Sequence, residues 1–237
     1  MRVNNMATCT EYLLTASVTL CAINVVGVCE TINVPGDHAT IQLAINAAED
    51  GDEIMVAAGN YAEHINFMGK TIELRSIDGP EFTTIDGQNT SPSLIIVDGG
   101  EMPGTMLSGF TIINGRSDAY EQGGGIHVGH NSSLELSNCV VEDCFSPHGG
   151  GIHVLGSYQK GRTFIMRDCI FQNCSSIHSA GLAWINGSHL GDTRVENCQF
   201  LSGNAYNGAV CVGGPIHKGY VSTDVSFVDC EFGQNTG

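Results

Sequence analysis

The feature that most constrains the fold is a short motif that recurs at nearly constant spacing through the second half of the chain. An Asn or Asp immediately precedes a cysteine in Asn138-Cys139, Asp168-Cys169, Asn197-Cys198 and Asp229-Cys230. The four cysteines are 30, 29 and 32 residues apart. A period of this length is typical of solenoids, in which each repeat buries its apolar face only against neighbouring repeats. The chain is therefore expected to be a stack of similar coils.

Each repeat shows the alternation of a β-strand around its cysteine. Cys139 and Val141 are two residues apart, as are Cys169 and Phe171, so each pair lies on one face of a strand. Phe110 lies 29 residues before Cys139 and extends the pattern upstream. The predicted inward core column is Phe110, Cys139, Cys169, Cys198 and Cys230. The Asn or Asp before each cysteine favours a bend, because its short side chain bonds nearby backbone and tolerates a left-handed conformation.

A glycine-rich strand precedes the cysteine strand in each repeat. Its copies are residues 123–128, 149–154, 179–184 and 207–212, where glycine permits close approach of the coils. When these segments are aligned residue by residue from their first positions, four residues fall in one outward column: His127, His153, Ala183 and Cys211. The column is the most regular outward feature of the repeats.

Four histidines form the candidate ligand surface. His127 and His153 would lie about 5 Å apart on adjacent strands, and His148 and His178 occupy the turns before those strands. Such a group suits ligand binding or proton transfer. The pattern favours a surface histidine stack instead, because the column continues as Ala183 and Cys211 rather than as catalytic residue types.

The N-terminal part contains the one convincing helix. In residues 40–48, Ile41, Ala44, Ile45 and Ala48 fall on one stripe, and Thr40 can cap the start. A solenoid needs a terminal unit that covers its open end, and we assign that role to this helix. The predicted fold is all-β, a right-handed parallel β-helix (solenoid) with an N-terminal capping helix.

Several of these segments together resemble the start of pectin-lyase-like right-handed parallel β-helix proteins. The matching motifs are Thr40-Ile-Gln-x-Ala-Ile-Asn-Ala-Ala48, Gly59-x-Tyr-x-Glu63, Lys70-x-Ile-x-Leu74, Ile85-Asp-Gly87 and Gly109-Phe-Thr-Ile-x-Asn-Gly115. The resemblance covers roughly residues 31–237 and implies the fold and an association with polysaccharides. The glycine-rich repeats also resemble, more briefly, those of polymorphic outer-membrane proteins.

The N-terminus indicates export. Residues 13–28 are largely apolar and end in small residues suited to cleavage after Cys29, so residues 1–29 read as a signal peptide. A transmembrane anchor is the alternative, but the run is short and contains Thr, Ser and Asn. Residues 30–237 would then be one secreted or cell-surface β-helix domain without a membrane span. Because the last repeat stops where a glycine-rich strand is due, we expect this domain to be truncated at its C-terminus.

The cysteines fit core packing better than a disulfide framework. Seven remain after the predicted leader, an odd number, and they occupy equivalent positions: a main column and a second one containing Cys144 and Cys174. Free cysteine behaves as a small buried hydrophobe. Disulfides stay the alternative for a secreted chain. No metal site is predicted, because the Cys-x-x-Cys pairing of zinc sites is absent.

The formal charge of −16 limits the partners. Nucleic acid is not an expected partner, because the basic footprint is missing. Polyanionic glycans would be repelled unless Ca²⁺ bridged them. No cofactor is evident, and Ca²⁺ is expected only if the protein acts on polyuronates.

The residues favour binding over a competent enzyme. Glycoside hydrolysis needs paired carboxylates facing one groove, and the outward glycine-strand positions hold none. Uronate lyases need a Lys or Arg base, for which the repeat region offers Arg116, Arg162, Arg167 and Arg194. We therefore expect a secreted or cell-surface β-helix protein associated with polysaccharide binding or processing. The alternatives are a non-catalytic structural or adhesive surface protein and, second, a polysaccharide lyase.

Overall fold

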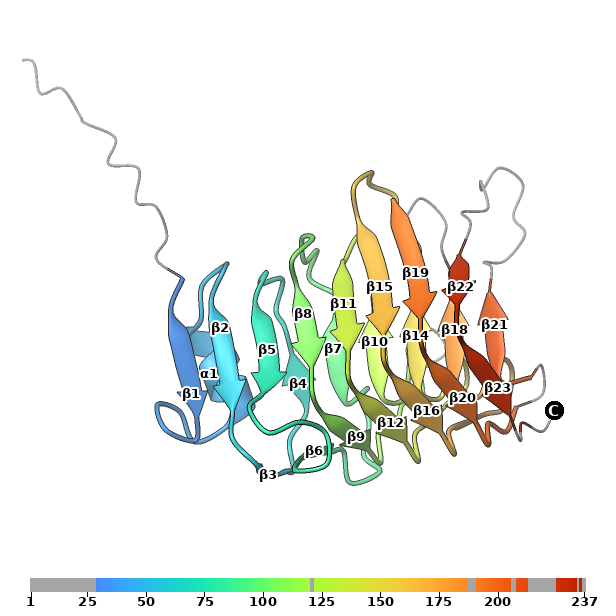
Figure 1. The fold of residues 1–237 in the computed structure, drawn as a ribbon, viewed down its shortest axis with the longest axis horizontal. Helices are drawn as coiled ribbons and strands as arrows, with labels where there is room; N and C mark the ends of the chain where they lie inside the picture. The colour runs from blue at the N-terminus through green and yellow to red at the C-terminus, as the bar shows by residue number, and fades with distance from the viewer. Residues whose placement is uncertain are drawn as a thin grey trace, which may run out of the picture.

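The computed structural model is a parallel β-helix, the architecture that the repeat and the resemblance both indicate (Figure 1). It describes residues 29–119, 122–186, 191–205, 208–212, 225–233 and 235. Three parallel sheets run along the stack, and a typical coil gives one strand to each. Of the predicted leader, residues 1–29, all but Cys29 lie outside the described residues, and Cys29 is exposed.

The described strands divide among the sheets as follows, in spatial order. Sheet A contains β1 (Thr31–Val34), β2 (Glu53–Val56), β5 (Glu73–Ser76), β8 (Met106–Ser108), β11 (Leu134–Ser137), β15 (Thr163–Arg167), β19 (Asp192–Glu196) and β22 (Ser226–Val228). Sheet B contains β3 (Gly59–Tyr61), β6 (Thr83–Asp86), β9 (Thr111–Ile113), β12 (Val140–Glu142), β16 (Ile170–Gln172), β20 (Gln199–Leu201) and β23 (Glu231–Gly233). Sheet C contains β4 (Ile65–Asn66), β7 (Ile95–Val97), β10 (Ile126–Val128), β14 (Ile152–Val154), β18 (Ala183–Ile185) and β21 (Val210–Val212). A short pair, β13 (Phe145–Ser146) and β17 (Ser175–Ser176), lies between sheets B and C in the chain.

The Asn or Asp before each cysteine forms the corner between sheets A and B. Asn138, Asp168, Asn197 and Asp229 have φ values of 48°, 53°, 51° and 52°. These are left-handed conformations, which Asn and Asp adopt more readily than other non-glycine residues. Gly109, with φ 79°, takes the same place before Phe110. The residue type at this corner thus follows from its backbone geometry.

A second left-handed corner follows sheet B in the same coils. Asn114, Asp143, Asn173 and Ser202 have φ values of 55°, 54°, 54° and 54°. Cys144 and Cys174 come directly after two of these corners and are buried. The two cysteine columns therefore have one origin: a small side chain fits inside the stack immediately after each tight bend.

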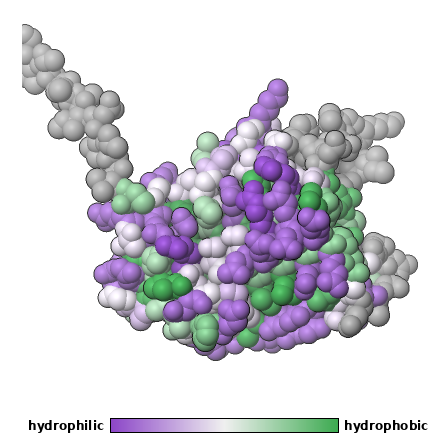
Figure 2. All heavy atoms as spheres, in the orientation of Figure 1, coloured by the Kyte–Doolittle hydropathy of each residue, from purple (hydrophilic) through white to green (hydrophobic). Residues whose placement is uncertain are grey.

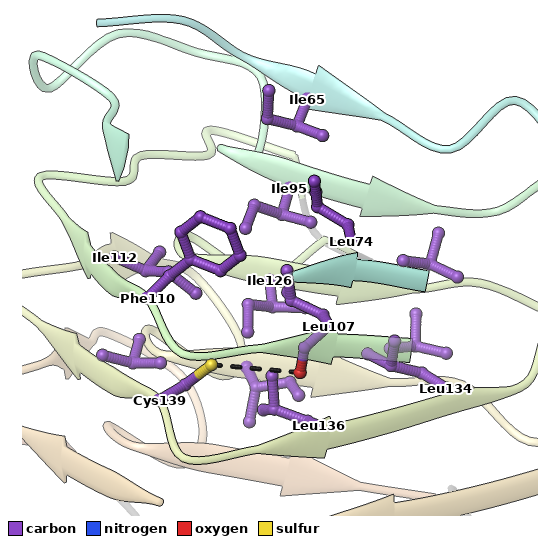
Figure 3. Close-up of a cluster of buried hydrophobic side chains, with 14 of the residues drawn as sticks. Ile65, Leu74, Ile95, Leu107, Phe110, Ile112, Ile126, Leu134, Leu136 and Cys139 are labelled. Carbon is purple, nitrogen blue, oxygen red and sulfur yellow. Dashed lines mark hydrogen bonds between the residues drawn. The ribbon is translucent and has the colours of Figure 1, made fainter. Parts of the chain in front are cut away.

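The predicted main column lies in the core. Phe110, Cys139, Cys169 and Cys198 are at most 1% exposed, whereas Cys230 in the last described coil is half-buried. Figure 3 shows Phe110 and Cys139 among Leu107, Leu136 and other aliphatic side chains from successive coils. The Cys139 thiol donates to the Ser137 carbonyl at 3.3 Å and, more weakly, toward Leu107 O at 4.0 Å. All the cysteines that the structure describes are free thiols.

Burial suppresses the acidity of two thiols of the main column. It raises the pKa of the Cys139 thiol to about 12. It also raises the pKa of Cys169 well above its usual range, and the hydrogen bond with the Cys198 thiol adds to the effect. The same hydrogen bond lowers the pKa of Cys198. Because the thiolate is the reactive form, Cys139 and Cys169 are expected to react slowly in the folded protein.

Helix α1 (Ile41–Ala47) lies at the N-terminal end of the stack, where it contacts β1, β2 and β4 (Figure 1). It buries Ile41, Ala44 and Ile45, and the Thr40 hydroxyl accepts a hydrogen bond from Leu43 N at 3.2 Å. These contacts close the apolar stripe of the helix against the first coils.

Two residues of the resemblance motifs hold the ends of α1. The Glu63 carboxylate accepts hydrogen bonds from Ile41 N at 2.9 Å and from Gln42 N at 3.0 Å. The Lys70 ammonium donates to the carbonyls of Ile45, Asn46 and Ala48 at 2.7–2.9 Å. An anion at the start of a helix and a cation at its end satisfy unpaired backbone groups and oppose the helix dipole. Glu63 and Lys70 therefore serve to hold α1 in place.

Removing the Glu63 carboxylate should weaken the N-terminal end of the stack. We expect Glu63→Ala to lower the free energy of unfolding by about 1–2 kcal/mol, because two helix N–H groups lose their acceptor. Glu81→Ala, which removes an exposed carboxylate in the turn before β6, is the matched control. Urea denaturation followed by circular dichroism measures both; equal midpoints for the two variants would contradict the capping role.

The outer face of sheet A is a ladder of opposite charges. Arg167 lies between Glu135 and Glu196, with nitrogen–oxygen distances of 3.6 and 2.8 Å, and Arg194 pairs with Asp192 and Glu196. Figure 2 shows hydrophilic side chains gathered over β15 and β19. Each of these arginines thus pairs with carboxylates of its own coil or of an adjacent coil. No helix in the described part of the chain is long and apolar enough to cross a bilayer.

Candidate functional site

The outer face of sheet C holds the candidate ligand surface, with a register that differs from the sequence prediction. Trp184, not Ala183, pairs with His153, and the Ala183 side chain points into the core and is fully buried. The described outward column reads Asn66, Ile96, His127, His153, Trp184 and Cys211. The prediction that Ala183 follows His153 in this column is therefore wrong, because the Trp184 indole takes that position, whereas Cys211 keeps its predicted place.

The cause of the one-residue error is the position of a single glycine. The sequence alignment matched Gly181 with Gly151, but the strand register matches it with Gly150. A Cβ on Gly150 would lie 2.6 Å from the Gly181 carbonyl oxygen and closer still to that of Ser175. One coil on, a Cβ on Gly181 would lie 2.9 Å from Asn204 O. The close approach of adjacent coils, rather than the position of a glycine within the aligned segments, decides which glycines take the same place in successive coils.

His127 and His153 lie on the outward side of their strands, but the sequence prediction of an exposed pair is wrong. Their neighbours Ile126 and Val128 point into the core, so the His127 ring faces the opposite side by alternation. The side chains are nevertheless only 3% and 1% exposed, and their ring centroids are 6.0 Å apart. The two histidine rings are therefore buried beneath other groups, and other residues of this face are in contact with solvent.

The structure brings the four predicted histidines together with Trp184. The His148 ring centroid lies 5.7 Å from that of His178, 6.5 Å from that of His153 and 6.3 Å from that of Trp184. The His153 and Trp184 rings are 4.2 Å apart. We call His148, His153, His178 and Trp184 the histidine–tryptophan patch. Within it His153 is buried, His148 and Trp184 are half-buried and His178 is exposed, so the patch opens to solvent on one side.

His127 extends the patch toward a carboxylate. Asp98, from the turn after β7, places Oδ2 3.8 Å from His127 Nε2. A Cβ on Gly129 would overlap the Asp98 carboxylate, so glycine at 129 leaves the room that this side chain occupies. His127 Nδ1 is buried and bonds none of the described residues. The Asp98 carboxylate thus lies at the edge of the outward column of sheet C.

The arginines that sequence offers as lyase bases lie away from the patch or are already bonded. Arg167 and Arg194 belong to the charge ladder of sheet A. Arg116 pairs with Asp118 at 2.8 Å. Arg162 is nearly buried and donates to the Asn131 carbonyl at 2.5 Å and to Gln159. None of these four described side chains is placed to abstract a proton at sheet C.

No group of three or more metal-ligating side chains with suitable geometry occurs among the described residues. The patch instead offers an aromatic face, half open to solvent, framed by imidazole rings. Sequence reasoning missed Trp184, although it is the one tryptophan of the chain. Trp184 follows Ala-Gly-Leu-Ala, whereas the histidines follow Gly-Gly-Gly-Ile. This difference in sequence is why alignment did not place Trp184 in the histidine column.

Comparison with known proteins finds one solved structure with a similar chain path. The crystal structure of the pectin methylesterase from Aspergillus niger matches with a TM-score of 0.42 and 11% identity, over 87% of this chain and 84% of that one. At this identity the similarity concerns the path of the chain and not its chemistry. No protein-family profile matches the sequence. No curated protein matches it either.

Proposed function

We propose that this protein is a secreted or cell-surface β-helix that binds polysaccharide through the histidine–tryptophan patch. The observation that carries the proposal is the half-buried Trp184 indole in contact with His153 and flanked by the His148 ring. Export is supported by the apolar stretch at residues 13–28.

The chemistry of the patch suits sugars. A pyranose ring has an apolar face of C–H groups and an equatorial rim of hydroxyls. The indole supplies a rigid aromatic surface for that face, at low entropic cost. Imidazole nitrogens, each a donor or an acceptor according to tautomer, suit the hydroxyl rim. His148 and His178 border the indole on its open side and could serve this role.

The arrangement supports binding rather than turnover. The carboxylate that the described contacts place beside this surface is Asp98, which faces His127. The patch itself consists of three imidazoles and an indole, without the paired acids that glycoside hydrolysis requires. Glycan binding by a surface protein is the function that these side chains suit.

Trp184 provides a direct test because it is the only tryptophan of the chain. We expect its fluorescence to change in a saturable way when a recognised polysaccharide is added. Trp184→Ala should weaken binding by about 2 kcal/mol, the loss typical of a central aromatic anchor, measured by calorimetry. Trp184→Phe should retain part of the affinity.

The matched control is Phe82→Ala, which removes an aromatic side chain that is 64% exposed next to sheet B. This variant should bind as the wild type does. Unaltered Trp184 fluorescence across a broad panel of neutral, acidic and amino polysaccharides would refute the proposal, as would full binding by Trp184→Ala.

A further inference from the structure

We infer that the histidine–tryptophan patch selects uncharged polysaccharide and discriminates against polyanionic chains such as polyuronates. The inference rests on the proposed function and specifies its ligand. It follows from where the cationic side chains lie in the fold and from which of them are already neutralised.

The described outward positions of sheet C contain no lysine or arginine. They are Asn66, Ile96, His127, His153, Trp184 and Cys211. Asp98 faces this column at His127, and its carboxylate is 48% exposed and negative. A uronate bound across the column would therefore meet an exposed carboxylate and no permanent cation.

Several described cations elsewhere are engaged in the fold. The arginines of sheet A pair with Glu or Asp of the same or adjacent coils, including Arg75 with Glu53. Lys70 is bonded to three carbonyls at the end of α1. Lys160 is exposed, but it lies in the turn between β14 and β15 rather than on a sheet C strand. No described arginine or lysine is thus directed at the patch from sheet C itself.

The whole-chain charge acts in the same direction. A formal charge of −16 repels a polyanion over about 10 Å at moderate ionic strength, and like charges brought into contact oppose binding further. A neutral chain meets neither penalty. The apolar faces of its sugars can still stack on Trp184, because the indole is only half-buried.

The test compares polymers that share a backbone and differ in charge. Hydroxyethyl cellulose is paired with carboxymethyl cellulose, and fully methyl-esterified galacturonan with its de-esterified form. Each is titrated into the full chain at pH 7.5, at low and at high salt, with Trp184 fluorescence and calorimetry as readouts. We expect the neutral member of at least one pair to bind at least about tenfold more tightly at low salt, with the gap narrowing as salt screens the repulsion.

The outcomes separate the two proposals. Equal or tighter binding of the anionic member in every pair that binds would overturn the selectivity while leaving polysaccharide binding intact. Binding of no polymer would overturn the proposed function and the selectivity with it. Asp98→Asn adds an internal check: it should improve binding of the anionic member and leave that of the neutral member unchanged, and no improvement would count against an electrostatic origin.

Discussion

Gly150→Ala is expected to unfold the middle of the β-helix. The added Cβ would lie 2.6 Å from Gly181 O and still closer to Ser175 O, and both oxygens belong to the backbone of the next coil. Gly181 O accepts from Gly151 N beside the ladder between β14 and β18, and Ser175 belongs to β17, which pairs with β13. Neither oxygen can move without disturbing the pairing of adjacent coils. We expect a loss of about 3 kcal/mol or more, at the upper end of the cost of overpacking.

The matched control for this prediction is Gly191→Ala. A Cβ at Gly191 would lie 3.4 Å from Arg162 O, which is an ordinary contact. Gly191 is exposed and lies immediately before β19. The midpoint of urea denaturation should fall sharply for Gly150→Ala and change little for Gly191→Ala. Similar midpoints would show that the coils can move apart at position 150. The close approach of the coils would then not explain the glycine at that position.

Cys169→Asp is expected to destabilise the fold by about 3–5 kcal/mol at neutral pH, the cost of a buried charge without a partner. Cys169 is fully buried between Cys139 and Cys198 of the adjacent coils, so the new side chain would meet thiols and aliphatic groups. Cys169→Ala removes volume alone and should cost about 1–2 kcal/mol. The free energies of unfolding at pH 7 distinguish the two substitutions.

The pH dependence of this pair has a definite sign. Burial would raise the pKa of an aspartate at position 169 above its unfolded value of about 4. The folded variant is therefore favoured below that value, and its stability falls as the pH rises from about 4 toward its folded pKa. The difference between Cys169→Asp and Cys169→Ala should thus shrink as the pH is lowered toward 4. A constant difference, or rapid reaction of Cys169 with a thiol reagent in the native protein, would contradict an inward Cys169.

The candidate site shows where sequence reasoning was insufficient. The four histidines were identified from their equivalent places in the repeat, and the structure does bring them together. Their exposure was misjudged for His127 and His153, because alternation tells which side of a strand a residue faces and not what covers that side. Trp184 was missed because Gly181 was aligned one residue away from its structural equivalent, and a shift of one residue reverses the face.

The sequence by itself determined the repeat, its corners and its core column. Left-handed bends at residues such as Asn138 and Asp168, and alternation around the cysteines, are written in consecutive residues and obey local steric rules. Only the tertiary structure decided that Trp184 follows His153 and that His127 faces Asp98. It also decided that Arg167 and Arg194 form ion pairs on the outer face of sheet A. The physical reason is that register between coils is set by close contacts between backbone atoms about one repeat apart. Those contacts depend on the space left by residues that are not neighbours in the chain.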